Sequence, residues 1–152
     1  MYSIEIEAFS SATPELLNEI VNLSQQITEL DQGLTQQAFE QRMLNSQALI
    51  LVARVEGELA GFKLGYAKND REFYSWLGGV APDFRQLGLA KEMLQYQEKW
   101  AKARGYHQIQ VKTRNCYTAM LNMLISNNYQ ITDLQTDPAN LARHKLHLQK
   151  SV

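Results

Sequence analysis

The sequence lacks the features that mark several specialised classes of protein. It has one cysteine, Cys116, in 152 residues, which excludes an intramolecular disulfide and a cysteine-rich metal site. The formal net charge is −1, so there is no overall positive field that would hold nucleic acid without regard to its sequence. The longest apolar run, residues 48–53, is much too short to cross a bilayer.

Other absences bear on the cellular location of the protein and on the cofactors that it can bind. The N-terminal stretch carries Glu5 and Glu7 and no basic residue, unlike a signal peptide, so we expect a cytoplasmic protein that binds neither nucleic acid nor membrane. The three histidines have no metal-ligand spacing, so we expect no metal. With 45% hydrophobic residues and no linker or repeat, we expect residues 1–152 to form one domain.

Apolar periodicity predicts an alternation of strands and helices. Thr13 and Pro14 are typical of a helix start, and Thr35 can cap a second helix that runs to about residue 45. We expect two further helices over residues 88–105 and 117–127, and strands over residues 2–9, 48–55, 59–67, 73–80, 108–113, 129–134 and 143–149. The second, third and fourth strands should form an antiparallel meander.

The most informative segment is V-A-P-D-F-R-Q-L-G-L-A-K-E-M, residues 80–93. A strand ends, Pro82 stops the pairing, and a short basic turn with one glycine leads into an amphipathic helix. The first turn of a helix has N–H groups without internal partners at the positive end of the macrodipole. A glycine there lets a phosphate approach the main chain. The segment therefore predicts a diphosphate-binding loop, although neither Gly-Lys-Ser/Thr nor G-x-G-x-x-G is present.

The spacing Arg85-x-x-Gly88-x-Ala90, after Val80-x-Pro82, resembles the acyl-CoA-binding motif [RQ]-x-x-G-x-[GA] of the GNAT family of N-acetyltransferases. The order of predicted elements is similar to that family over essentially the whole chain. The resemblance implies an α/β (α+β) fold with a mixed, mostly antiparallel twisted sheet of about seven strands and four helices on both faces. It also implies acetyl-CoA as the acyl donor, direct transfer to a primary amine of a small molecule or peptide, and it allows a homodimer.

The resemblance assigns the cofactor site residue by residue. Two glycines late in a strand favour a bulge, which in this family separates the strand from the one after the long helix and admits the pantetheine arm. A kink that only relieves crowding is the alternative. The resemblance makes the N–H of Val80 the oxyanion donor and matches Asn115 to a residue that touches pantetheine. The cofactor-binding residues would be Gly78, Gly79, Val80, Arg85, Gln86, Leu87, Gly88, Leu89, Ala90, Lys91 and Asn115.

The catalytic acid departs from the family pattern. The family's second motif, N…A…L-Y-x-x-x-G-F, matches Asn115, Ala119 and Asn128-Tyr129, and its tyrosine protonates the thiolate. Leu124 stands at that position and cannot donate a proton. Tyr117 is a substitute donor or a packing residue. The missing tyrosine keeps open a catalytically weak or inactive acyl-CoA-binding sensor, and a purely structural domain is a third interpretation.

The acceptor site is predicted more weakly. Glu29 and Asp31 follow the first helix, where this fold builds the acceptor entrance, and Glu72 comes from a central strand. We expect these acids to bind the amine or remove its proton. Aromatic residues of the central strands either line the acceptor pocket or pack in the core; these are Tyr66, Tyr74 and Trp76.

Overall fold

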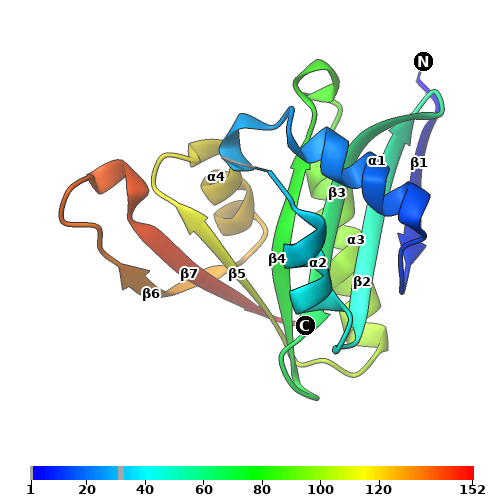
Figure 1. The fold of residues 1–152 in the computed structure, drawn as a ribbon. Coiled ribbons are helices and arrows are strands. Elements are labelled where there is room, and N and C mark those ends of the chain that lie inside the picture. The colour runs from blue at the N-terminus through cyan, green and yellow to red at the C-terminus, as the bar shows by residue number, and fades with distance from the viewer. Residues whose placement is uncertain (1, 31–32) are drawn as a thin grey trace.

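The computed structural model describes residues 2–30 and 33–152, and its sheet has seven strands in the order β1-β2-β3-β4-β5-β7-β6 (Figure 1). All neighbouring strands are antiparallel except the parallel pair β4 and β5. The mixed sheet and the β2–β3–β4 meander are confirmed. The strands are β1 (Ile4–Phe9), β2 (Ala48–Val55), β3 (Glu58–Ala67), β4 (Glu72–Val80), β5 (Gln108–Arg114), β6 (Gln130–Gln135) and β7 (Lys145–Ser151).

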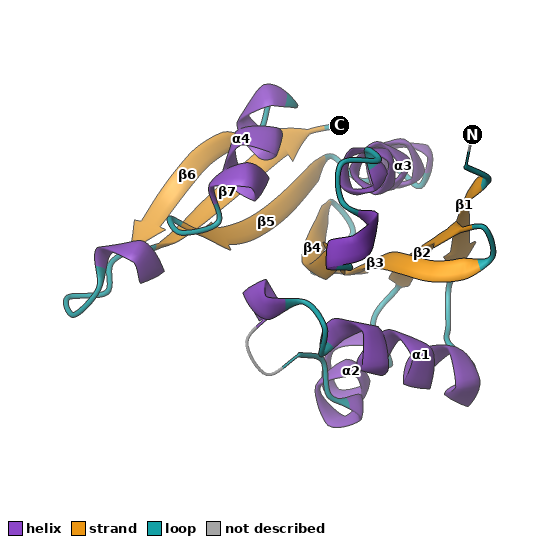
Figure 2. Ribbon diagram, turned by 90° about the horizontal axis from the view of Figure 1, so that it is seen from above, coloured by secondary structure: helices purple, strands orange, loops and turns teal. Residues whose placement is uncertain are grey.

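Four α-helices cover the two faces of this sheet, as predicted. Two lie on one face, α1 (Pro14–Ser24) and α2 (Gln36–Met43), and two on the other, α3 (Leu89–Ala103) and α4 (Thr118–Ser126) (Figure 2). Short 3₁₀ turns are η1 (Thr28–Leu30), η2 (Pro82–Phe84) and η3 (Leu141–Arg143). Within the described ranges, no helix is long and apolar enough to cross a membrane.

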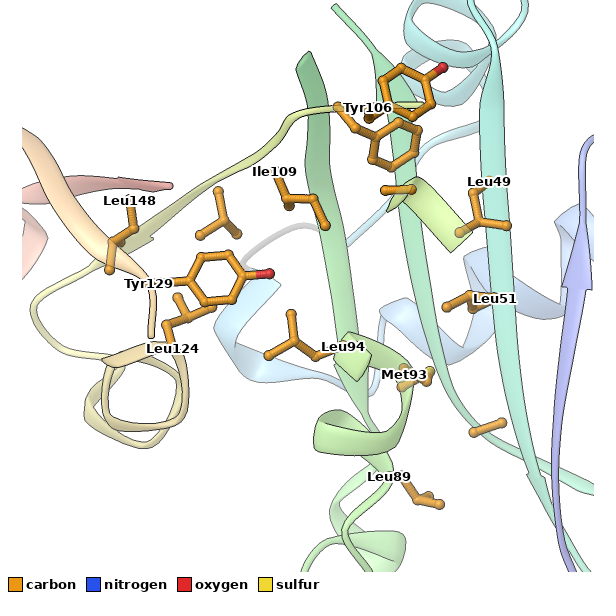
Figure 3. Packing of buried hydrophobic residues seen from close by; sticks show 14 of the residues in the cluster. Leu49, Leu51, Leu89, Met93, Leu94, Tyr106, Ile109, Leu124, Tyr129 and Leu148 are labelled. Atoms are coloured by element: carbon orange, nitrogen blue, oxygen red, sulfur yellow. The ribbon is translucent and has the colours of Figure 1, made fainter. Parts of the chain in front are cut away.

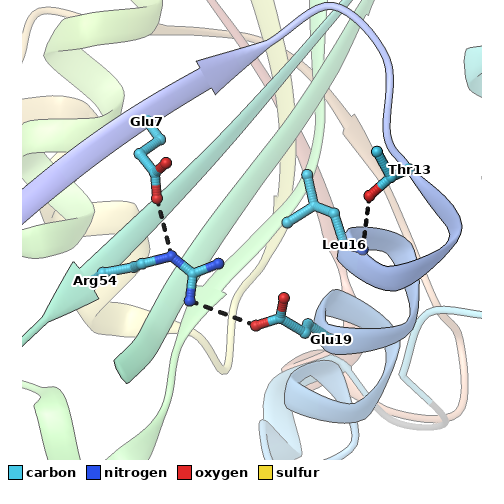
Figure 4. A network of polar contacts seen from close by, with 5 residues as sticks. All are labelled: Glu7, Thr13, Leu16, Glu19 and Arg54. Carbon is cyan, nitrogen blue, oxygen red and sulfur yellow. Dashed lines mark hydrogen bonds and ion pairs between the residues drawn. The ribbon is translucent and has the colours of Figure 1, made fainter. Parts of the chain in front are cut away.

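Local signals explain where the first helices begin. The Oγ1 atom of Thr13 accepts the N–H of Leu16 at 3.1 Å (Figure 4), and Pro14 occupies the first helical position. Thr35 caps α2 in the same way, through the N–H of Ala38 at 3.1 Å. Sequence reasoning identified both starts because a cap lies next to the helix that it caps.

Alternation along the buried strands gives the molecule two cores. In β2, Leu49 and Leu51 face α3 and α4, whereas Ile50 and Val52 face α1 and α2. Figure 3 shows the first of these cores, which also contains residues of β5, β7 and α4. At the edge of the sheet, Arg54 contacts Glu7 at 2.9 Å and Glu19 at 3.4 Å and so ties β1 and β2 to α1 (Figure 4).

The central strands differ from the prediction in one respect. The β3–β4 register shifts so that Leu64 faces Leu77 and Gly65 faces Ser75, which leaves Trp76 without a partner on β3. The bulge is therefore at Trp76, and the prediction that placed it at the two glycines is wrong. A Cβ on Gly78 would lie 2.8 Å from the carbonyl oxygen of Phe62, and one on Gly79 would lie 2.8 Å from Cδ1 of Ile27. These glycines permit close packing instead.

The expected separation of β4 from β5 is present. The two strands pair only from Glu72 through Ser75, opposite Gln108 through Val111, and then diverge. The rest of β4, from Trp76 to Val80, has β3 on one side and, among the described strands, no pairing partner on the other. This divergence places a free main-chain edge beside the loop that follows β4.

Candidate functional site

The loop between β4 and α3 presents a row of main-chain donors. Gln86 and Gly88 have φ angles of +68° and +78°, which turn the chain sharply before Leu89 begins the helix. Within the described residues, no hydrogen bond engages the N–H groups of residues 86–91, and the first bond across the helix start joins the N–H of Glu92 to the carbonyl of Gly88. A Cβ on Gly88 would meet nothing within 4 Å. Such a row at the positive end of a helix suits an anion.

The free edge of β4 adjoins this loop. The N–H of Ala81 donates to the carbonyl of Ala60 on β3 at 2.8 Å. Because donors alternate between the two sides of an antiparallel strand, the N–H groups of Val80 and Gly78 point away from β3, toward the side that β5 has left. The predicted oxyanion donor, Val80, therefore lies on the free edge.

One arginine links this edge to the opposite face of the sheet. Arg85 donates through Nε to the carbonyl of Val80 at 3.3 Å and contacts a carboxylate oxygen of Glu29, in η1, at 2.9 Å. Burial alone would raise the pKa of Glu29, but the hydrogen bond and charge of Arg85 give a pKa below its ordinary value. The structure thus brings together two predicted residues that are 56 positions apart. Asp31 lies outside the described residues.

The three aromatic candidates also lie together. Tyr66 packs edge-on against Tyr74, with ring centroids 5.5 Å apart, and against Trp76 at 6.2 Å. Arg42 of α2 lies 5.0 Å from the Trp76 ring and donates to the hydroxyl of Tyr66 at 2.9 Å. Tyr74 is only 8% exposed, and burial raises the pKa of its hydroxyl, so packing accounts for this residue. The guanidinium of Arg42 therefore already occupies the face of Trp76.

Other predicted residues lie apart from the loop. Glu72 is at the opposite end of β4 from Val80, where it accepts hydrogen bonds from Asn69 and Gln110, which argues against a role in proton removal. The side-chain amide of Asn115 donates to the carbonyl of Leu141 at 3.0 Å and is engaged by the protein.

The remaining predicted site residues lie near the start of α3 and near α4. Lys91 is exposed on the first turn of α3, and Tyr117 is half-buried just before α4. Leu124, at the position expected for the acid, is fully buried in the core between the sheet and α4 (Figure 3).

A buried polar group around Lys63 was not identified from the sequence. Lys63 of β3 is 8% exposed and lies directly opposite Gly78, whose missing side chain leaves room for the lysine stem. Burial lowers the pKa of Lys63 from 10.5 to about 8, and the charge of Glu98 on α3 opposes that shift. Glu98 also contacts Nζ of Lys150 at 3.1 Å. The signal in the sequence was a lysine inside an otherwise apolar central strand.

Two neutral side chains extend this group. Tyr129 is 2% exposed, and burial, followed by the charge of Glu98, raises the pKa of its hydroxyl. Figure 3 shows that hydroxyl directed toward the side of the core where Leu94 and Ile109 lie. Gln97 is fully buried, and neither polar atom of its carboxamide has a hydrogen-bond partner among the described residues. Buried polar atoms without partners are uncommon and call for an explanation such as a ligand or water.

Comparisons with known proteins agree with this geometry. The family model for the acetyltransferase (GNAT) family matches residues 15–124. An acetyltransferase of Pectobacterium atrosepticum is 33% identical over 97 residues, which cover 64% of this chain and 68% of that protein.

Solved structures share the fold at low sequence identity. The ribosomal-protein-S18-alanine N-acetyltransferase of Escherichia coli superposes with a TM-score of 0.81 at 15% identity, covering 99% of this chain and 94% of that one. A GNAT family acetyltransferase of Elizabethkingia anophelis with acetyl-CoA bound gives a TM-score of 0.74 at 17% identity, with 98% of each chain covered. The family model covers more than half of the chain, and the chain therefore belongs to the acetyltransferase (GNAT) family, whose members are acetyl-CoA-dependent N-acetyltransferases.

Proposed function

We propose that the protein transfers the acetyl group of acetyl-CoA directly to a primary amine of a small molecule or peptide, with the diphosphate on the N–H groups of residues 86–91. The observation that carries this proposal is that these six consecutive donors have no acceptor in the described part of the chain. The bound acetyl-CoA of the Elizabethkingia relative, which has the same fold, supports it. The pantetheine arm would run along the free edge of β4.

The chemistry needs few protein groups. The amine nitrogen attacks the thioester carbonyl carbon, the oxygen gains negative charge, and the C–S bond then breaks. A main-chain N–H aimed at that oxygen, here that of Val80, is worth on the order of 3–4 kcal/mol. The amine must lose a proton, and the carboxylate of Glu29, which contacts Arg85 of the loop, is the group proposed to accept it. Tyr117 stays a predicted proton donor to the sulfur, and a homodimer and a cytoplasmic location stay predictions.

The test is acetyl-CoA binding by calorimetry in two matched glycine variants. Gly88→Glu puts bulk and negative charge among the free donors, and we expect affinity to fall at least about 100-fold, or ~2.7 kcal/mol. Gly105→Glu is the control, because Gly105 also has a positive φ, +89°, and open space around it, but lies at the other end of α3. Equal affinities in the two variants would contradict the assignment of the diphosphate site.

A catalytically weak sensor of acyl-CoA is the second candidate, and the burial of Leu124 at the position expected for the acid favours it. The sensor would bind acetyl-CoA tightly but acetylate no amine in a broad panel. Measurable acetyl transfer to even a poor acceptor would exclude this alternative.

A further inference from the structure

One face of the C-terminal half of the sheet, β5 to β7, is basic, and no α-helix of the described residues covers it. Ile109, Val111 and Thr113 of β5 point into the core with α3 and α4, so the alternate residues Lys112 and Arg114 point to the other face. By the same alternation in β7, Lys145 and His147 share that face. Figure 2 shows α1 and α2 under the N-terminal half of the sheet, away from β5, β7 and β6.

Positively charged residues of neighbouring strands face each other on this surface. In the β5–β7 register, Arg114 lies directly opposite Lys145. Like charges at directly opposed positions destabilise a sheet. The pKa of Lys112 is lowered, first by burial and then by the positive charges of Lys145, Lys68 and Arg42. Cations from α2, the β3–β4 turn, β5 and β7 are therefore close enough to repel one another.

This basic face borders the divergence of β4 and β5. The Nζ atoms of Lys68 and Lys112 lie 5.8 Å and 5.4 Å from the ring of Tyr74, the residue just before the last β4–β5 pair. Any amine that reaches the free edge of β4 from this side passes these cations. These cations repel a lone ammonium, whereas they attract an amine that is attached to a negatively charged group.

Two acids lie near the face, but the charges that shift the pKa of Lys112 are all positive. Glu72 has both carboxylate oxygens engaged, one by Asn69 and one by Gln110. Asp133 lies opposite His147 on β6, and one of its oxygens accepts the N–H of Leu134 at 2.9 Å. Because the net charge of the whole chain is −1, the basic character is local to this face.

We propose that the acceptor is an acidic peptide, an inference that rests on the proposed function. The free amine of the peptide enters at the β4–β5 divergence, and its carboxylates contact Lys112, Arg114 and Lys145. The geometry favours a peptide over a small metabolite because the cations are spread along two strands. Lys112 and Arg114 are two residues apart on β5, or about 6.6 Å at a strand rise of about 3.3 Å per residue. Alternate side chains of an extended peptide have the same spacing, so successive carboxylates can each meet a cation.

The experiment compares synthetic peptides of equal length with a free N-terminal amine, in which the third and fifth residues are glutamate, glutamine or lysine. Transfer from acetyl-CoA is followed by mass spectrometry. We expect kcat/KM for the glutamate peptide to exceed that of the glutamine peptide about tenfold, and the difference to shrink at high salt because screening weakens surface charge interactions. The double variant Lys112→Glu/Lys145→Glu should prefer the lysine peptide. The control is Lys99→Glu/Lys102→Glu, an equal charge change at exposed positions of α3.

A second measurement separates this inference from the proposed function. Fluorescence anisotropy of the same peptides, acetylated at the N-terminus and labelled, reports binding without any transfer. Failure of acetyl-CoA to bind would defeat the proposed function, whereas equal binding of the glutamate and glutamine peptides, with acetyl-CoA bound, would overturn the acidic acceptor. Tighter binding of a single-stranded oligonucleotide of the same charge would also overturn it, because it would assign the face to nucleic acid.

Discussion

Lys63 is the residue with the clearest energetic consequence. Its pKa in the folded protein is about 8, below the ordinary 10.5, so between these values the unfolded chain binds more protons than the native state. The free energy of unfolding therefore rises with pH through this window, and below about pH 8 the protein carries the full cost of burying the charge. A shift of this size corresponds to a cost on the order of 3 kcal/mol.

We expect Lys63→Met to stabilise the protein at pH ~7 by about 1–3 kcal/mol, because a side chain of similar length replaces the buried ammonium and Glu98 keeps its contact with Lys150. The gain should shrink toward pH ~10, where the native lysine is neutral. Urea denaturation of both proteins at the two pH values measures it. Destabilisation at neutral pH would mean that attraction to Glu98 outweighs the burial cost. A stabilising result would mark Lys63 as a residue kept despite its cost, which is typical of functional sites.

At the scale of elements, the decisive feature is that β4 is paired on both sides in its first half and on one side in its second. The N–H of Ala81 is bonded to β3, whereas those of Gly78 and Val80 face the side without a partner. Free amides exchange their hydrogens faster than bonded ones. Pantetheine along this edge would bond to the free amides as an added strand does.

Hydrogen exchange by NMR tests this arrangement. Without ligand, the amides of Gly78 and Val80 should exchange at least about tenfold faster than that of Ala81, since they have no acceptor among the described residues. Saturating acetyl-CoA should slow Gly78 and Val80 and leave Ala81 nearly unchanged. Uniform protection of all three in the free protein would contradict the free edge, and uniform slowing by the ligand would indicate general stabilisation instead of a bond to this edge.

The same elements show what a sequence can and cannot predict. Thr13, Pro14 and Gly88 act on residues next to them in the chain, so the helix starts and the glycine turn before α3 could be identified from sequence. The bulge at Trp76 depends on the register of β4 against β3, and the two glycines after it are explained by Phe62 and Ile27, which are distant in sequence. No local pattern carries that information.

The candidate site follows the same rule. Arg85 was predicted to be beside the loop, which is local, but its contact with Glu29 spans 56 positions. The basic face arises because β7 lies between β5 and β6, so that Lys145 comes to lie opposite Arg114. That strand order is a property of the whole sheet, and periodicity along single strands does not specify it.

At the scale of the molecule, only four residue pairs of the described strands join β4 to β5, yet β1–β4 and β5–β7 share the core on the α3–α4 face. Leu49 and Leu51 of β2 belong to the same cluster as Ile109 of β5 and Leu148 of β7 (Figure 3). Because α3 packs across both halves, loss of either half exposes apolar surface of the other. The chain should therefore unfold in one cooperative transition.

The two tryptophans make that expectation measurable. Trp100 packs against Phe73 on the α3 side, with ring centroids 5.1 Å apart, and Trp76 lies on the α1–α2 side, so Trp76→Phe and Trp100→Phe each leave a reporter on one face. Thermal unfolding followed by fluorescence should give coincident midpoints for both reporters and for circular dichroism. Acetyl-CoA at about 100 times its Kd stabilises a protein by about 2.7 kcal/mol. At about 2–4 °C per kcal/mol for a chain of this size, both midpoints should rise together by roughly 5–11 °C. A rise at one reporter alone would show that the ligand stabilises the packing on one face of the sheet without the other.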